Sequence, residues 1–75
     1  MEKITDKTGR IAFIGGGMMA EAILKGMLHK EIAEPEMIII SDPSAGRREY
    51  LEKTYRVNTT GCNVEAVKSA GFVIL

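Results

Sequence analysis

The chain has 75 residues, of which 45% are hydrophobic and 27% are charged, and its ten basic and ten acidic side chains give a formal net charge of zero. This composition is typical of one small globular domain and excludes a disordered chain, and the balanced charge provides no electrostatic footprint for nucleic acid. Cys62 is the single cysteine, so an internal disulfide is excluded and no metal site is expected. Without a signal peptide or a membrane-length apolar run, we expect a cytoplasmic protein.

The N-terminal third predicts a lead-in, a strand, a turn and a helix. Residues 1–9 are polar and aperiodic, which indicates a flexible lead-in to a domain over residues 10–75. Residues 10–14 predict a buried strand, three glycines follow, and residues 17–29 have helical spacing. The expected apolar face of this helix consists of Met19, Ala22, Ile23, Gly26 and Met27.

The same helix predicts an ion pair, a close contact at a glycine and a basic residue at its C-terminal end. Glu21 and Lys25 are spaced for an i,i+4 ion pair on the opposite, solvated face. Gly26 lowers helix stability, which indicates a close contact between helix and strand. His29 in the last turn suits the negative end of the helix dipole.

Strand, glycine turn and helix is the order in which a dinucleotide-binding unit begins. In the spacing Gly15-x-Gly17-x-x-Ala20, Gly15 allows the tight turn, Gly17 lets the backbone approach a pyrophosphate, and Ala20 allows close packing of the helix on the sheet. Main-chain amides at the helix start would bind the pyrophosphate. The alternative is a strand-to-helix turn that holds no ligand.

The remaining elements alternate between strand and helix. They are expected at residues 37–40, 45–54, 56–60, 64–70 and 72–75, the last being a fourth buried strand. Pro43 ends the second strand, and Ser44 is expected to cap the second helix. Asn63 is expected to cap the third helix, which Gly71 would end.

This order predicts an α/β fold, the first half of a Rossmann-type doubly wound parallel sheet (β-α-β-α-β-α-β) with strand order 3-2-1-4. An apolar last strand would leave an exposed sheet edge. We therefore expect the natural protein to continue beyond these residues.

The end of the second strand bears on the choice of cofactor. Asp42, a little farther from Gly15 than the usual spacing, can accept hydrogen bonds from ribose hydroxyls, which favours NAD. Arg47 and Arg48 can pair with a 2′-phosphate, which favours NADP, or can form a solvated helix face. Ala20 in place of a third glycine also favours NADP. The residues are compatible with either cofactor.

Three segments together resemble the start of bacterial pyrroline-5-carboxylate reductases. They are Ile-Gly-Gly-Gly-Met-Met-Ala-Glu-Ala-Ile at residues 14–23, Ile-Ser-Asp-Pro at 40–43, and Asn-Val-Glu-Ala-Val at 63–67, and the likeness covers about residues 10–75. The resemblance implies an enzyme of proline biosynthesis that reduces Δ1-pyrroline-5-carboxylate to L-proline with NADPH, or with NADH in some members. It also implies a C-terminal helical domain, absent here, through which subunits form homo-oligomers, so the chain alone is expected to be inactive.

The resemblance and the fingerprint together define a candidate cofactor site and no catalytic residue. The site comprises Ile14, Gly15, Gly16, Gly17, Met18, Met19 and Ala20 in the phosphate loop, Ser41 and Asp42 at the adenosine ribose, Arg47, and Asn63. For Asn63 the two roles of helix cap and cofactor contact are compatible.

The chain departs from the family pattern at two positions, and its opening half is also compatible with other functions. Members usually carry Asn or Gln where this chain has Met18, so a polar contact is lost or made by backbone alone, and Gly71 replaces a common aspartate. The alternatives are another NAD(P)-dependent dehydrogenase, of the β-hydroxyacid type, and a non-catalytic nucleotide-binding module. A methyltransferase is disfavoured because Phe13 and Ile14 stand where an acidic residue usually ends the first strand.

Overall fold

The computed structural model describes residues 9–75, so the lead-in predicted over residues 1–9 lies, apart from Gly9, outside the described residues. Strands and helices alternate along the chain. The elements are β1 (Ile11–Ile14), α1 (Met18–His29), the 3-10 helix η2 (Pro35–Met37), β2 (Ile38–Ser41), α2 (Ala45–Tyr55), β3 (Asn58–Thr60), α3 (Asn63–Lys68) and β4 (Phe72–Ile74).

The strands form one parallel sheet in the order β3-β2-β1-β4. In this sheet Ile11 of β1 lies beside Ile38 of β2 on one side and beside Phe72 of β4 on the other. The chain therefore winds outward from β1 first through β2 and β3, and then returns to place β4 on the other side. The predicted Rossmann-type fold and its strand order are confirmed.

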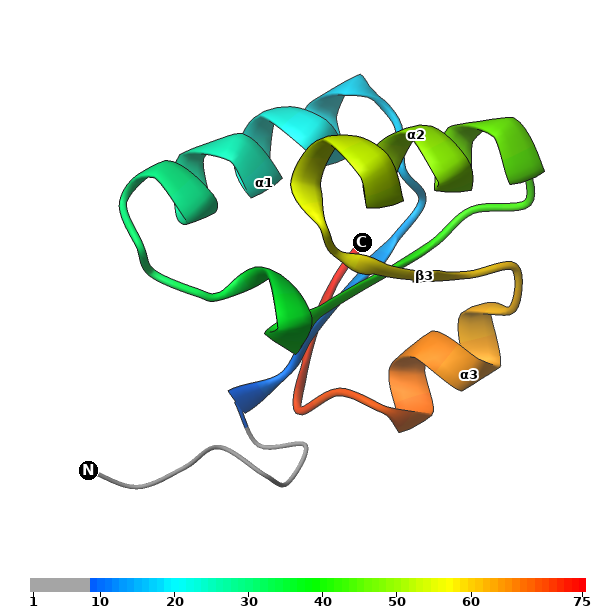
Figure 1. Cartoon of the computed structure of the whole chain (residues 1–75). Helices are drawn as coiled ribbons and strands as arrows, with labels where there is room; N and C mark the ends of the chain where they lie inside the picture. The colour runs from blue at the N-terminus through cyan, green and yellow to red at the C-terminus, as the bar shows by residue number, and fades with distance from the viewer. Residues whose placement is uncertain (1–8) are drawn as a thin grey trace.

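Helices cover both faces of the sheet. Figure 1 shows α1 and α2 on one side of the strands and α3 on the other. Neighbouring residues of β1 divide between the two layers: Phe13 packs in the larger cluster with Leu24 and Leu51, whereas Ala12 packs with Ala66 of α3. Burial on both faces explains why β1 is apolar throughout.

The expected apolar face of α1 was wrong except at Met27. Leu24 is fully buried, and its neighbours on the same stripe, Ala20, Met27 and Leu28, pack against the core. Met19 and Ile23 are instead 78% and 41% exposed. The helix carries two adjacent apolar rows with the same period, and contact with β1 and β2 selects the row that contains Leu24.

Two further expectations for α1 were wrong. A Cβ atom added at Gly26 would meet nothing within 4 Å, so this glycine makes no close contact with a strand. Glu21 is half-buried and pairs with Arg47 of α2, not with Lys25. The side of α1 that carries Glu21 faces α2, which the helix pattern alone does not indicate.

The predicted caps are confirmed at one helix and wrong at another. Ser44 caps α2, accepting a hydrogen bond of 3.2 Å from the Arg47 amide. At α3 the N-cap is Cys62, and Asn63 is the first helical residue. The helix ends at Lys68, with Ser69 and not Gly71 as its C-cap, and the Ser69 amide and hydroxyl both donate to carbonyls of the preceding turn.

The fourth strand is less buried than expected. Phe72 is 61% exposed and Val73 is 40% exposed. β4 lies at the edge of the sheet and pairs with β1 alone, which leaves much of its side-chain surface uncovered.

Candidate functional site

The chain turns sharply as it leaves β1. Gly15 has a φ of +96°, a backbone conformation that L side chains rarely adopt, and its amide donates a hydrogen bond of 2.7 Å to the carbonyl of Ser41 at the end of β2. The predicted role of Gly15 in the tight turn is confirmed.

Gly16 is the tightly packed glycine of this loop. A Cβ atom at Gly16 would lie 2.8 Å from Cδ1 of Leu51 and 3.1 Å from Oδ2 of Asp42. The Gly16 amide donates to Oδ2 of Asp42 at 2.9 Å, and its carbonyl accepts from Nε of Arg47. Both polar groups of this residue are therefore held by the segment that begins α2.

Gly17 is extended (φ −75°, ψ −172°) and is the N-cap of α1. No side chain of residues 9–75 caps this helix end, and a Cβ atom at Gly17 would meet nothing within 4 Å. The amides of the first turn of an α-helix have no carbonyl partner within the helix. The space beside Gly17 is thus open, next to the positive end of the α1 dipole.

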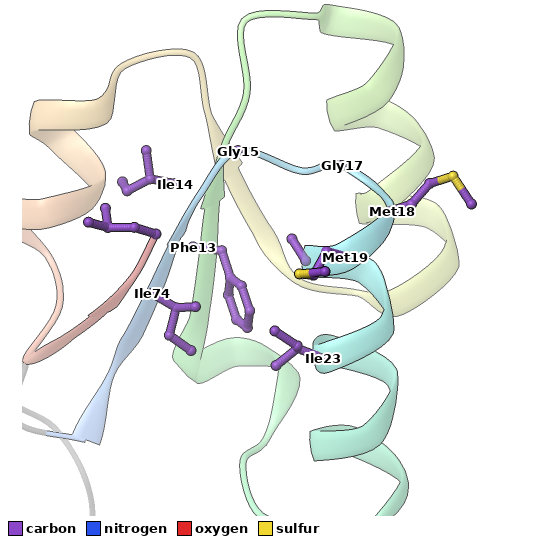
Figure 2. Close-up of a pocket in the computed structure, with 10 residues that line it drawn as sticks. Phe13, Ile14, Gly15, Gly17, Met18, Met19, Ile23 and Ile74 are labelled. Atoms are coloured by element: carbon purple, nitrogen blue, oxygen red, sulfur yellow. The ribbon is translucent and has the colours of Figure 1, made fainter.

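A hollow of about 350 Å³ lies beside this loop. Its lining is mostly apolar and comprises Phe13, Ile14, Gly15, Gly17, Met18, Met19, Ala20, Ile23, Ile74 and Leu75. It lies at the carboxyl ends of β1 and β4, where the winding changes direction and where doubly wound sheets bind their ligands. Figure 2 shows Met19 and Ile23 turned toward this hollow and the side chain of Met18 extending away from β1. The Met18 side chain is 87% exposed, so it does not occupy the space enclosed by the glycine loop.

Three predicted residues meet at the carboxyl end of β2. Ser41 is 1% exposed, and its hydroxyl donates to Oδ1 of Asn63 on α3. The carboxylate of Asp42 accepts from two backbone amides, Gly16 at Oδ2 and Ser44 at Oδ1, both at 2.9 Å. Both groups are thus partnered within the protein.

Arg47 belongs to a polar cluster between α1 and α2. Its Nη2 donates to Oε1 of Glu21 at 2.7 Å, and its guanidinium carbon lies 5.0 Å from the centre of the Tyr50 ring. The hydroxyls of Tyr50 and Tyr55 both donate to Oε2 of Glu21, the former at 2.6 Å. The two tyrosine rings meet edge to face, 6.4 Å between centres.

These contacts change two pKa values. The hydroxyls of Tyr50 and Tyr55, followed by Arg47, lower the pKa of Glu21 from 4.5 to about 2 because each donates a hydrogen bond to the ionised carboxylate. The pKa of Tyr55 is raised, first by burial and then by its bond to Glu21, since both disfavour the phenolate. Glu21 is therefore a carboxylate at neutral pH.

Sequence reasoning missed this cluster, although α2 contains a signal for it. Arg47, Tyr50 and Tyr55 follow the spacing i, i+3, i+8, which places them on one helix face together with Leu51. The structure therefore joins the glycine loop to Asp42 and Arg47, and separately joins Ser41 to Asn63.

Among residues 9–75 there is no group of three or more His, Cys, Asp or Glu side chains that could hold a metal ion. This part also has no helix with the length and apolarity needed to cross a bilayer.

The chain is similar to several pyrroline-5-carboxylate reductases, which confirms the resemblance predicted from its sequence. It is 41% identical over 66 residues to the enzyme of Synechocystis sp., covering 88% of this chain and 25% of that one. It is 42% identical over 65 residues to the Haemophilus influenzae enzyme, covering 87% of this chain and 23% of the relative. The solved structure of a pyrroline-5-carboxylate reductase from Coxiella burnetii superposes with a TM-score of 0.80 at 30% identity, covering 88% of this chain and 24% of that one.

These comparisons also show how much of each relative's length the chain matches. The chain spans about a quarter of the length of the curated relatives that it matches. A family model described as NADP oxidoreductase, coenzyme F420-dependent, matches residues 10–75, and its description names a nicotinamide dinucleotide. Because this match covers most of the sequence, the chain belongs to that family of NADP oxidoreductases.

Proposed function

We propose that this chain is the cofactor-binding part of a pyrroline-5-carboxylate reductase, which reduces 1-pyrroline-5-carboxylate to L-proline with NAD(P)H. The observation that carries the proposal is the open, uncapped start of α1 at Gly17, beside a hollow at the carboxyl ends of β1 and β4. The relatives that share this segment carry that name.

The phosphate loop of the proposed site runs from Ile14 to Ala20. The first-turn amides of α1 and the positive end of its dipole suit the two negative charges of a diphosphate. Gly17 leaves room for the diphosphate to approach the backbone. Met18 offers no polar side chain, so the contact at this position is made by its amide.

The nucleoside end of the proposed site lies at the carboxyl end of β2, where Ser41, Asp42, Arg47 and Asn63 are found. We propose NADP as the cofactor, with NAD as the alternative. Two observations support NADP. Both oxygens of Asp42 already accept backbone amides, which competes with ribose hydroxyls for this carboxylate. In addition, Arg48 brings a positive charge to the first turn of α2, next to the carboxyl end of β2.

The work of this chain in the proposed reaction is binding and orientation. When bound, the reduced nicotinamide supplies the hydride that adds to the imine carbon of the substrate. The apolar hollow lined by Ile14, Met19 and Ile74 adjoins the loop. No residue of the chain is proposed as an acid or a base. The pyrroline carboxylate site and the contacts of a homo-oligomer are assigned to a helical domain like that of the resembling enzymes.

A domain exchange tests the proposed function. The segment of the Synechocystis enzyme that matches this chain is replaced by residues 10–75, and NADPH oxidation is measured with and without 1-pyrroline-5-carboxylate. The control exchange introduces the matching segment of the Haemophilus influenzae enzyme. That segment makes up 23% of its enzyme, close to the 25% that is replaced in the Synechocystis enzyme. We expect substrate-dependent oxidation from both. Turnover by the control alone would count against the proposal.

A further inference from the structure

We propose that Asp42 and Arg47 act on the cofactor through the peptide groups of Gly16, which they hold from both sides, and not through the ribose 2′ position. Both are then positioning residues for the diphosphate loop. This inference rests on the proposed function and assigns the roles of two residues within that site.

Asp42 holds the amide side of Gly16. Its Oδ2 accepts from the Gly16 amide, and its Oδ1 accepts from the Ser44 amide, each at 2.9 Å. The backbone of Asp42 is fixed as well, since its amide donates to the carbonyl of Thr60 at 3.0 Å and its carbonyl accepts from Nη1 of Arg48 at 2.7 Å. The carboxylate is therefore held in one orientation, turned toward the loop.

Arg47 holds the carbonyl side of Gly16. Its Nε donates to that carbonyl, while Nη2 donates to Glu21 at 2.7 Å. The Tyr50 ring lies against one face of the guanidinium, and the side chain is 28% exposed. Glu21, 17% exposed, is itself fixed by the hydroxyls of Tyr50 and Tyr55. The fork of Arg47 is thus directed at the loop and at α1.

The two contacts fix the loop in a single conformation before a ligand arrives. Gly16 lies between the turn at Gly15 and the open position at Gly17, so holding its amide and its carbonyl sets the direction of the amides that follow. Leu51 closes the remaining side, because its Cδ1 would lie only 2.8 Å from a Cβ atom at Gly16. A site ordered in advance loses less entropy when its ligand binds.

The effect on NADPH and NADH binding distinguishes a loop-positioning role of Asp42 and Arg47 from a direct contact with the ribose. NADPH and NADH share the diphosphate and differ at the ribose 2′ position, so a loop-positioning residue supports both to the same extent. An arginine bound to the 2′-phosphate would support NADPH alone, and a carboxylate bound to the ribose hydroxyls would support NADH alone.

The test is the ratio of the NADPH and NADH dissociation constants for the chain and its variants Arg47→Lys and Asp42→Asn. Lysine keeps the positive charge but cannot bridge Gly16 and Glu21 with a planar fork. We expect each variant to weaken both cofactors, on the order of tenfold for one lost charge-assisted hydrogen bond, with the ratio unchanged. Lys53→Ala is the matched control, because it removes an exposed cation from the same helix.

A local measurement excludes a general loss of structure. Hydrogen exchange of the Gly16 amide should accelerate in Asp42→Asn, while the amides of β1 and β2 keep their rates, and Lys53→Ala should leave all of them unchanged. A selective loss of NADPH in Arg47→Lys, or of NADH in Asp42→Asn, would overturn the inference while leaving the proposed function intact. Failure of the unmodified chain to bind either cofactor would instead count against the proposed function itself.

Discussion

The hydroxyl of Ser41 donates a hydrogen bond to Oδ1 of Asn63, and this contact joins the end of β2 to the start of α3. Because Ser41 is 1% exposed, its hydroxyl hydrogen needs an acceptor within the protein, and the amide oxygen of Asn63 provides it. The contact therefore ties the exposed first residue of α3 to the buried end of β2.

A double-mutant cycle tests the coupling of Ser41 and Asn63. We expect Ser41→Ala to lower the free energy of unfolding by about 1 kcal/mol, the net value of one hydrogen bond. In a chain that already carries Asn63→Ala, the same substitution should cost clearly less. Chemical denaturation of the four proteins provides the measurement, and equal costs in both backgrounds would show that the two side chains act independently.

The depressed pKa of Glu21 predicts a pH dependence of stability. The folded-state pKa is about 2 and the unfolded value is about 4.5, so the folded protein binds fewer protons between these values. The stabilisation from this carboxylate is therefore complete above about pH 4.5 and is lost as the pH falls toward 2. Unfolding free energies of the chain and of Glu21→Gln should converge over that range. Glu49→Gln, at an exposed ion pair, is the control; a constant difference between the chain and Glu21→Gln would contradict the prediction.

Gly16→Ala should destabilise the fold. The new methyl group would lie 2.8 Å from Leu51, which is fully buried, and 3.1 Å from the carboxylate of Asp42. Overpacking of this kind costs about 1–3 kcal/mol. Thermal unfolding checks the prediction, with Gly46→Ala as the control because its Cβ has 4.0 Å to the nearest atom, in Ser44. An unfolding midpoint for Gly16→Ala at or above that of the unmodified chain would be the contrary result.

Gly26→Ala should stabilise the fold, in contrast to Gly16→Ala. The position is inside α1, and an added Cβ would meet nothing within 4 Å. Alanine in a helix interior is more favourable than glycine by about 1 kcal/mol. A lower unfolding free energy for this variant would show a contact at Gly26 that the structure lacks.

The sequence was sufficient to predict the order of the elements and the winding of the sheet. The apolar runs of the strands, the glycine turn and the Ser44 cap are local signals, and the parallel order β3-β2-β1-β4 follows from them through general rules for α/β folds. The turn at Gly15 was predicted for the same reason, because its positive φ is a local requirement.

What the sequence could not predict depends on packing between distant segments. The Met19 and Leu24 rows of α1 have the same helical period, and only contact with the sheet selects the latter. The fingerprint marks Gly15 and Gly17, whereas the crowding at Gly16 comes from Leu51 on α2. A charged residue such as Arg47 is exposed in most helices, so its contact with the loop is not visible in the pattern.

The most direct test of the diphosphate site is a titration of the chain and of Gly17→Val with NADPH. A Cβ atom at Gly17 meets nothing within 4 Å, so the valine should cost the fold little beyond a less favourable N-cap, about 1 kcal/mol, while it occupies the space of the diphosphate. Circular dichroism confirms that the variant is folded, and Gly26→Ala is the matched glycine control. We predict that the chain and Gly26→Ala bind NADPH equally and that Gly17→Val binds it at least about tenfold more weakly, a loss of about 1.4 kcal/mol. Equal affinity of Gly17→Val and the unmodified chain would contradict the site.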